Sequence, residues 1–192
     1  MKNLYAVAFL FLIGINMKAQ ESDFPKNEAK LNIANTIAIA SVEVGYERFI
    51  GFNQSVDVEF LINDRINYHS EKGSRKFNTN SIKLGYNYYF GKENAGSGIY
   101  ANPFVKYRFG DFEQERNIEL PSNISGLSIV GNKIETDMNA FIVGLGAGYK
   151  WNFGDKFVLG PYVSIARNFS DEVKERFSAI EFHGGFSVGY RF

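Results

Sequence analysis

Only two histidines occur in the chain, and one of them has neighbours that suggest acid–base chemistry. His183 follows Glu181 by two residues and precedes Ser187 by four, so in a β-strand the three side chains share one face. Serine, histidine and carboxylate are the groups of a hydrolase. Along a strand, however, His183 and Ser187 are about 13 Å apart, so another serine such as Ser164 would have to be the nucleophile. We instead predict that His183 belongs to a polar network and that the chain has no catalytic residues.

The other histidine, His69, lies in the charged segment 63–80 beside Glu71. Three basic residues follow it: Lys72, Arg75 and Lys76. Basic side chains are suited to bind phosphate oxygens, so one hypothesis is contact with the phosphate groups of lipopolysaccharide. The simpler interpretation is a solvated loop.

No cofactor or metal ion is predicted. Residues 144–148, Gly-Leu-Gly-Ala-Gly, resemble a phosphate-binding loop, but they lie within a strand-like segment that no helix follows. The chain has no cysteine, which excludes disulfides and thiolate ligands. Its acidic residues do not have the spacing of a calcium loop.

The N-terminus has the pattern of an export signal. Lys2 precedes an apolar run over residues 4–15, and a small residue, Ala19, stands before Gln20. The run is shorter than the roughly 20 residues of a spanning helix, and the pattern is typical of a secretory signal peptide. We therefore divide the chain into a signal peptide, a periplasmic lead and one domain: residues 1–19, 20–28 and 29–192. Removing residues 1–19 takes away two lysines and leaves 19 basic against 21 acidic residues, which gives no reason to expect a nucleic-acid partner.

The domain alternates apolar and polar residues with a period of two, which predicts strands with unlike faces. Asn35 interrupts the apolar face of the first strand. Pro103 and Pro161 fall inside later strands and predict β-bulges, because proline cannot donate to the ladder. The eight predicted strands span residues 30–38, 42–49, 54–62, 81–90, 99–109, 139–151, 157–165 and 180–192.

The polar faces of these strands carry charges of both signs together with many glycines. The interior of an eight-stranded barrel is only just wide enough for side chains, and an unpaired charge there is costly. We therefore expect an interior network in which basic and acidic side chains pair across the lumen. Its predicted members are Asp57, Glu59, Lys83, Lys106, Arg108, Lys150, Glu181, His183 and Arg191.

Alternation alone would also fit a soluble periplasmic lipocalin-like carrier, with its apolar residues inside. Two observations favour the opposite orientation, with the apolar face toward lipid. Short and long connections alternate between the strands, as in barrels with short periplasmic turns and long extracellular loops. Aromatic residues also gather near the strand ends in two bands, as at the two membrane interfaces. The band at the short turns contains Phe49, Phe52, Tyr88, Phe90, Trp151, Phe153, Phe157, Tyr190 and Phe192, and the other contains Phe60, Tyr107, Phe109, Phe141, Phe169 and Phe182.

The last strand ends on an aromatic residue, with apolar residues at alternate positions before it. This pattern, formed by Phe186, Val188, Tyr190 and Phe192, resembles the signal that the barrel assembly machinery recognises. The sequence therefore predicts an all-β fold, an eight-stranded antiparallel up-and-down transmembrane barrel in the outer membrane. Its expected surroundings are membrane lipid and lipopolysaccharide.

The longest connection, residues 110–137, has charged outer parts and an apolar centre. A loop of this length needs a reason. It extends the strands as a surface hairpin for an unknown partner, folds over the barrel as a plug, or is a loop without a partner. The apolar residues of its centre are Ile118, Leu120, Ile124, Leu127, Ile129 and Val130.

Several short motifs resemble small outer-membrane β-barrel proteins of Bacteroidota, which share the architecture of OmpA- and OmpX-type barrels. They are Ala-Lys-Leu-Asn-Ile at 29–33, Val-Gly-Tyr-Glu-Arg at 44–48, Tyr-Tyr-Phe-Gly-Lys at 88–92, Gly-Leu-Gly-Ala-Gly-Tyr-Lys at 144–150, Ala-Arg-Asn-Phe at 166–169 and Gly-Tyr-Arg-Phe at 189–192. The resemblance implies a barrel and no catalytic residue. We expect a non-enzymatic outer-membrane protein that supports the envelope or presents surface loops. The alternatives are an enzyme acting on lipid A or phospholipid, the lipocalin-like carrier, and a porin-like pore.

Overall fold

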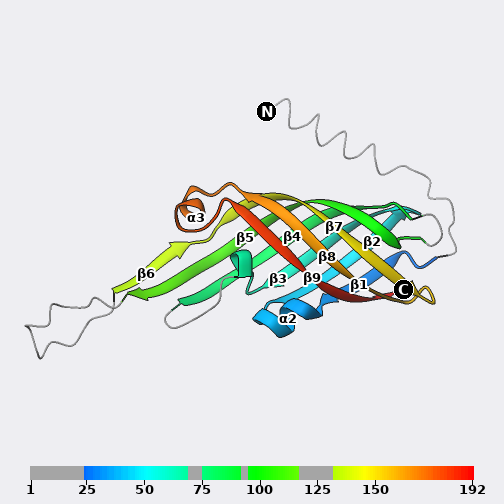
Figure 1. Cartoon of the computed structure of the whole chain (residues 1–192), viewed down its shortest axis with the longest axis horizontal. Helices are drawn as coiled ribbons and strands as arrows, with labels where there is room; N and C mark the ends of the chain where they lie inside the picture. Colours follow the sequence, from blue (N-terminus) through cyan, green and yellow to red (C-terminus); the bar gives the residue numbers. More distant parts are fainter. Residues whose placement is uncertain (1–23, 69–74, 92–94, 117–131) are drawn as a thin grey trace, which may run out of the picture.

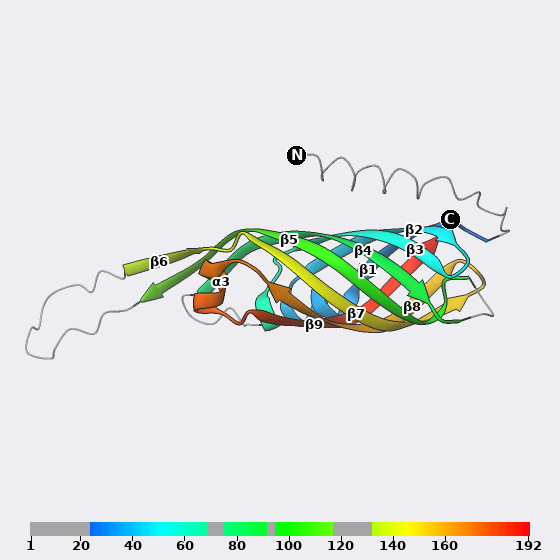
Figure 2. The same ribbon diagram turned by 90° about the horizontal axis from the view of Figure 1, so that it is seen from above.

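The computed structural model describes residues 24–68, 75–91, 95–116 and 132–192, and within these ranges the chain forms one antiparallel sheet that closes into a barrel. Figures 1 and 2 show the cylinder from two directions, with one hairpin projecting from one end. Its elements are β1 (Asn27–Asn32), α2 (Ile33–Ile39), β2 (Val42–Gly51), β3 (Gln54–Ile62), η2 (Ile66–Tyr68), β4 (Arg75–Tyr89), β5 (Gly98–Arg116), β6 (Asn132–Asp137), β7 (Ala140–Phe153), β8 (Phe157–Asn168), α3 (Asp171–Arg176) and β9 (Ile180–Arg191).

The barrel wall has eight strands, as predicted. Each strand pairs antiparallel with its neighbours in the chain, and β1 pairs with β9 to close the cylinder. The part of β5 that lies in the wall pairs with β7, and the part that extends beyond the wall pairs with β6. β6 and β7 therefore pair with successive parts of the same long strand. Gly110 has a φ of 118° at the point where β5 leaves the wall, a backbone conformation that glycine adopts without strain. No helix in the described ranges is long and apolar enough to cross a membrane.

The first predicted strand, 30–38, is wrong in its second half. β1 begins at Asn27, within the predicted lead, and ends at Asn32, after which the chain turns into α2. As part of a strand Asn35 would lie on the apolar outer face. In α2 it is buried instead, and its amide donates to Glu43 at 2.6 Å. The helix lets the Asn35 amide be buried with a hydrogen-bond partner, and this determines the local structure against the strand that the period-two pattern predicts.

The bulges predicted at Pro103 and Pro161 are also wrong. The register of β5 and of β8 is the same before and after each proline. No residue is inserted beside either proline. Instead, a few backbone pairs are missing on one side of each. Beside Pro103, the side-chain amide of Asn102 donates to the Tyr86 carbonyl at 3.4 Å and replaces part of the missing ladder.

The two faces of the wall have the predicted orientation. Leu84, Val105 and Leu145 are 51%, 39% and 56% exposed on the outside, whereas Lys106 is 6% exposed inside. A lipocalin-like barrel would have the opposite arrangement, so the structure contradicts that alternative. The outer surface is instead an apolar belt around a charged interior.

The end of the barrel from which the hairpin projects is closed by an apolar cluster. We call it the apolar cap. Its members come from η2, from α3 and from the strands and their connections at this end of the barrel: Ile66, Phe77, Phe104, Phe112, Met138, Ala140, Ile142, Ala166 and Val173, with Phe177 packed against them. Val173 belongs to α3, whose N-cap residue Ser170 accepts a hydrogen bond from the Val173 amide. Acidic residues in the first turn and basic residues in the last suit the dipole of this short helix.

Candidate functional site

The lumen contains ion pairs at three levels, and the first lies near the short turns. Glu28 accepts from Lys150 at 2.8 Å and from the Arg191 Nε at 2.9 Å. Lys150 also contacts Glu47 at 2.8 Å. The other guanidinium nitrogens of Arg191 donate to the carbonyls of Ala95 and Gly96, at 2.8 and 2.6 Å. This level ties the two terminal strands to the β4–β5 turn and closes the barrel at that end.

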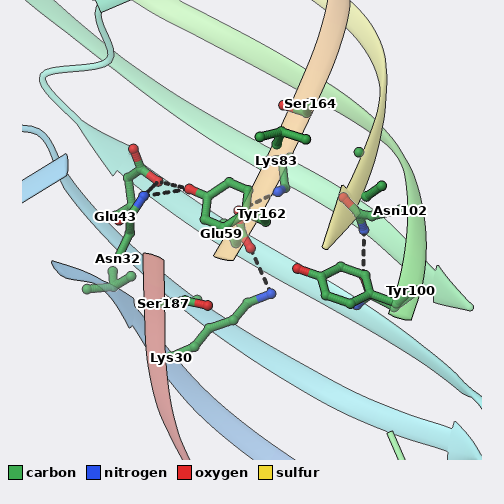
Figure 3. Close-up of a pocket in the computed structure, with 16 residues that line it drawn as sticks. Lys30, Asn32, Glu43, Glu59, Lys83, Tyr100, Asn102, Tyr162, Ser164 and Ser187 are labelled. Atoms are coloured by element: carbon green, nitrogen blue, oxygen red, sulfur yellow. Dashed lines mark hydrogen bonds and ion pairs between the residues drawn. The ribbon is translucent and has the colours of Figure 1, made fainter. Parts of the chain in front are cut away.

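The second level lies near the middle of the barrel (Figure 3). The Lys30 ammonium is 2.7 Å from Glu59 and 3.2 Å from Asp57. Lys83 approaches the other oxygen of Glu59 at 2.5 Å. Asn102 completes the group by donating to Asp57 at 3.2 Å. Each carboxylate here has at least two donors, as a buried charge requires.

The third level lies below the apolar cap. The Arg108 guanidinium binds Glu181 with two hydrogen bonds of 2.8 and 2.7 Å, and its Nε donates to Asp64 at 3.0 Å. Lys106 contacts Asp64 at 2.9 Å, and Asn168 donates to Glu181 at 3.0 Å. Arg108 is fully buried, so this paired geometry is what makes its burial tolerable.

A fourth group surrounds Glu43 at the side of the lumen. One carboxylate oxygen lies 2.6 Å from the Asn35 amide and 3.0 Å from the His183 Nε2. The other lies 2.8 Å from Asn32 and 2.6 Å from the Tyr162 hydroxyl. These partners come from α2, β9, β1 and β8, so one carboxylate joins four elements.

All nine predicted network residues lie in these groups. The sequence analysis missed other members: Glu28, Lys30, Asn32, Asn35, Glu43, Glu47, Asp64, Asn102, Tyr162 and Asn168. The predicted set itself indicated that acidic members were missing, because it contained five cations and only three carboxylates. The structure adds four carboxylates and one cation, which makes seven carboxylates against six cations and His183.

The hydrolase hypothesis requires a serine other than Ser187, such as Ser164, beside His183. The Ser187 hydroxyl donates to the Gly160 carbonyl at 3.4 Å. Ser164 is the cross-strand register partner of His183, but the Nε2 of His183 faces Glu43 and Tyr162. In the described ranges, no group of three or more histidine, aspartate or glutamate side chains is placed to hold a metal ion.

Side chains fill most of the lumen. One cavity of about 30 Å³ lies between Lys30, Glu43 and Tyr100, and another of about 20 Å³ lies between Lys106, Ser164 and His183. Each has room for only one or two water molecules. The arrangement is that of a packed polar core.

The outward side chains form the apolar belt, with aromatic residues near both ends. Eight of the nine predicted at the turn rim are 40% to 61% exposed: Phe52, Tyr88, Phe90, Trp151, Phe153, Phe157, Tyr190 and Phe192. The prediction for Phe49 is wrong: it is 3% exposed and packs inside the barrel against Tyr89 and Arg191, because residue 49 lies on the inward face of β2 with Glu43 and Glu47. The opposite band, predicted at the loop rim, is also exposed. The alternating Phe186 and Val188 of β9 share the outward face with Tyr190.

The long connection forms a hairpin stem in its described part. β5 and β6 pair from Asp111–Asp137 to Arg116–Asn132, and both views show the stem leaving the barrel (Figures 1 and 2). Arg176 of α3 braces it by donating to Thr136 at 2.9 Å and to Gln114 at 2.6 Å. The apolar centre of the connection, the segment around His69 and the signal peptide lie outside the described residues.

Among the comparisons with known proteins, the family match agrees with the barrel. The autotransporter β-domain family matches residues 53–179, more than half of the chain. A solved structure, the N-terminal β-barrel domain of Pseudomonas aeruginosa OprF, is similar at 16% identity and a TM-score of 0.43 over 86% of this chain and 95% of that chain. No curated protein matches the chain. The chain belongs to the autotransporter β-domain family of outer-membrane β-barrels.

Proposed function

We propose that the protein is a non-enzymatic integral barrel of the outer membrane that holds a hairpin above the membrane for a partner. The observation that carries this proposal is the combination of a filled lumen with a stem that projects beyond the wall. A filled lumen suits an anchor rather than a conduit, and we expect no steady conductance in planar bilayers. Projecting strands suit recognition at the surface.

Export and assembly are part of the same proposal. Residues 1–19 act as the signal peptide, and the alternating residues Phe186 to Phe192 act as the signal for the barrel assembly machinery. The apolar belt contacts lipid and the loop rim contacts lipopolysaccharide. The outward exposure of the belt supports this arrangement.

The stem has the character of a surface element in water. Lys133 and Glu113 pair across it at 2.9 Å with exposed side chains. The hydrogen bond from Lys133 lowers the pKa of Glu113 below its ordinary value. Such pairs set the shape and charge of a surface at little gain in stability.

Replacing residues 113–135 with a two-residue turn tests the proposal. The full-length and the shortened protein are purified from native outer membranes in mild detergent, and copurifying proteins are compared. We expect the shortened barrel to keep its heat-modifiable migration and to lose a protein that the full-length chain retains. An unchanged set of copurifying proteins would refute a binding role for the hairpin.

The second candidate is an enzyme acting on lipid A or phospholipid. The 3.0 Å contact between His183 and Glu43, with Ser164 in register, is the observation that favours it. Mass spectrometry of lipids from a deletion strain, complemented with the normal chain or with His183→Ala, decides between the two. An altered lipid that only the normal chain restores would favour the enzyme, and unchanged lipid would favour the anchor.

A further inference from the structure

The barrel wall is incomplete where β1 meets β9. Their pairing runs only from Glu28–Arg191 to Asn32–Ser187. Beyond Ser187 the wall continues on the β9 side, over Ile180–Phe186, but the opposite side is α2 rather than a strand. Figure 1 shows α2 at the side of the barrel, next to β1 and β9. We call this place the seam.

Side chains replace the missing strand along the open edge of β9. The Asn32 side chain accepts from the Phe186 amide at 3.3 Å. The Asn67 side chain accepts from the Phe182 amide at 2.6 Å and donates to the Ile180 carbonyl at 3.1 Å. Two asparagines thus satisfy backbone groups that a strand would otherwise pair. Asn32 is also the N-cap residue of α2 and accepts from the Asn35 amide, whereas the bonds of Asn67 come from η2 and do not involve α2.

The α2 segment is a weak helix by its own composition. It has seven residues, of which four are β-branched, and such residues have low helix propensity. A helix of this length is not stable by itself in water. Its C-cap, Ala40, has a φ of 53° in the left-handed region, where a residue with a Cβ is strained. Tertiary contacts must therefore hold α2 in position.

The main polar contact of α2 with the lumen is a single buried side chain. Asn35 donates to Glu43 at 2.6 Å and lies 3.4 Å from the His183 Nε2. Glu43 also binds Tyr162 on the far side of the seam. On the outer side of α2, Ile37 is 84% exposed. Inside the lumen two asparagines hold the helix, Asn35 within it and Asn32 at its N-cap, whose amide lies 2.8 Å from Glu43 and 2.6 Å from the Tyr162 hydroxyl. On the outside the helix presents exposed apolar side chains.

We propose that α2 is a gate in the barrel wall, whose displacement opens a lateral path from the lipid-facing surface to the lumen at the seam. The path leads from an apolar surface to the hydrogen-bonding groups of Glu43, Tyr162 and His183. A molecule that enters it from the bilayer is therefore an amphiphile, with a polar end that reaches these groups. This inference rests on the proposed insertion of the barrel in the membrane.

Labelling of single cysteines tests the gate, because the chain has no cysteine of its own. Ser187→Cys places a thiol in the lumen next to the seam, on a residue that lines the 30 Å³ cavity. Ser55→Cys is the control, since Ser55 also faces the lumen but is fully buried near the turn rim, where it donates to Glu47, whereas Ser187 is half-buried. Both variants are placed in lipid vesicles and treated with a long-chain alkyl maleimide dissolved in the bilayer or with a charged maleimide in water.

We expect the alkyl maleimide to label the thiol at 187 and not the one at 55. Adding Asn35→Ala should accelerate labelling at 187 by about tenfold or more, the effect of removing one hydrogen bond to a charged group. Adding Ala40→Gly, which relieves the left-handed strain, should slow it. The charged maleimide should label neither thiol.

Three outcomes would overturn the gate. They are equal labelling rates at 187 with and without Asn35→Ala, an equal increase at 55, and labelling from water alone. Heat-modifiable migration of the same samples reports insertion separately. A protein that is inserted but shows no lateral labelling therefore refutes the gate alone, whereas a protein that fails to insert refutes the proposed function.

Discussion

Arg108 and Glu181 face each other across the lumen and share two parallel hydrogen bonds, of 2.8 and 2.7 Å. Both side chains are buried, and they lie directly below the apolar cap. The pair links β5 to β9, which are not neighbours in the wall. It therefore fixes the barrel's cross-section in a way that backbone pairing does not.

Removing one partner of this pair should be severe. Arg108→Met leaves the Glu181 carboxylate buried without its main partner, and we expect a loss of about 3–5 kcal/mol in the free energy of unfolding. Urea titration in lipid vesicles, read from the heat-modifiable band, measures it. The double variant Arg108→Met with Glu181→Met should recover much of this loss. Additive losses in the double variant would show that the two side chains do not act as a pair.

The same substitution at two lysines should have very different effects. Lys150→Ala removes a buried ammonium that contacts Glu28 and Glu47, and we expect a loss of several kcal/mol, about 3 or more. Lys133→Ala breaks an exposed pair on the hairpin stem and should change stability by about 1 kcal/mol or less. Similar unfolding midpoints for the two variants would contradict a closely packed, water-poor lumen.

A close approach of two backbones predicts a glycine requirement in β8. A Cβ at Gly160 would collide with the backbone carbonyl of Tyr149, whereas at Gly51 it would meet only the Gln54 Cβ at 3.9 Å. We expect Gly160→Ala to cost about 1–3 kcal/mol or more through overpacking. Gly51→Ala is the control and should be close to neutral. The unfolding midpoints in urea again give the comparison, and equal midpoints would rule out the close approach.

The sequence predicted the barrel because its main determinant is local. Alternation puts Leu84 and Lys83 on opposite faces whatever the neighbouring strands are, so the strands and the charged lumen could be derived together. The same alternation could have identified Glu43 and Glu47 within a predicted strand. An excess of basic residues in the predicted lumen was the signal that these acids had been missed.

Other features depend on contacts that local patterns do not contain. Asp64 lies beyond the end of β3 and enters the network because the loop folds inward to Arg108. α2 replaces the second half of the first predicted strand because the Asn35 amide donates to Glu43 on another strand. The apolar cap contains residues that are far apart in the sequence, such as Ile66 of η2, Phe112 of β5 and Val173 of α3. Each of these required the closed barrel before it could be deduced.

The orientation of the wall toward lipid can be measured with the chain's single tryptophan. Trp151 is 42% exposed on the outer face near the short turns. In vesicles made with brominated lipids we expect its fluorescence to be quenched, most strongly by bromine near the headgroups. Moving the indole with Trp151→Phe and Leu145→Trp should shift the strongest quenching to bromine deep in the acyl chains. Fluorescence that resists brominated lipid at every depth but is quenched by iodide in water would show that this face does not contact the bilayer.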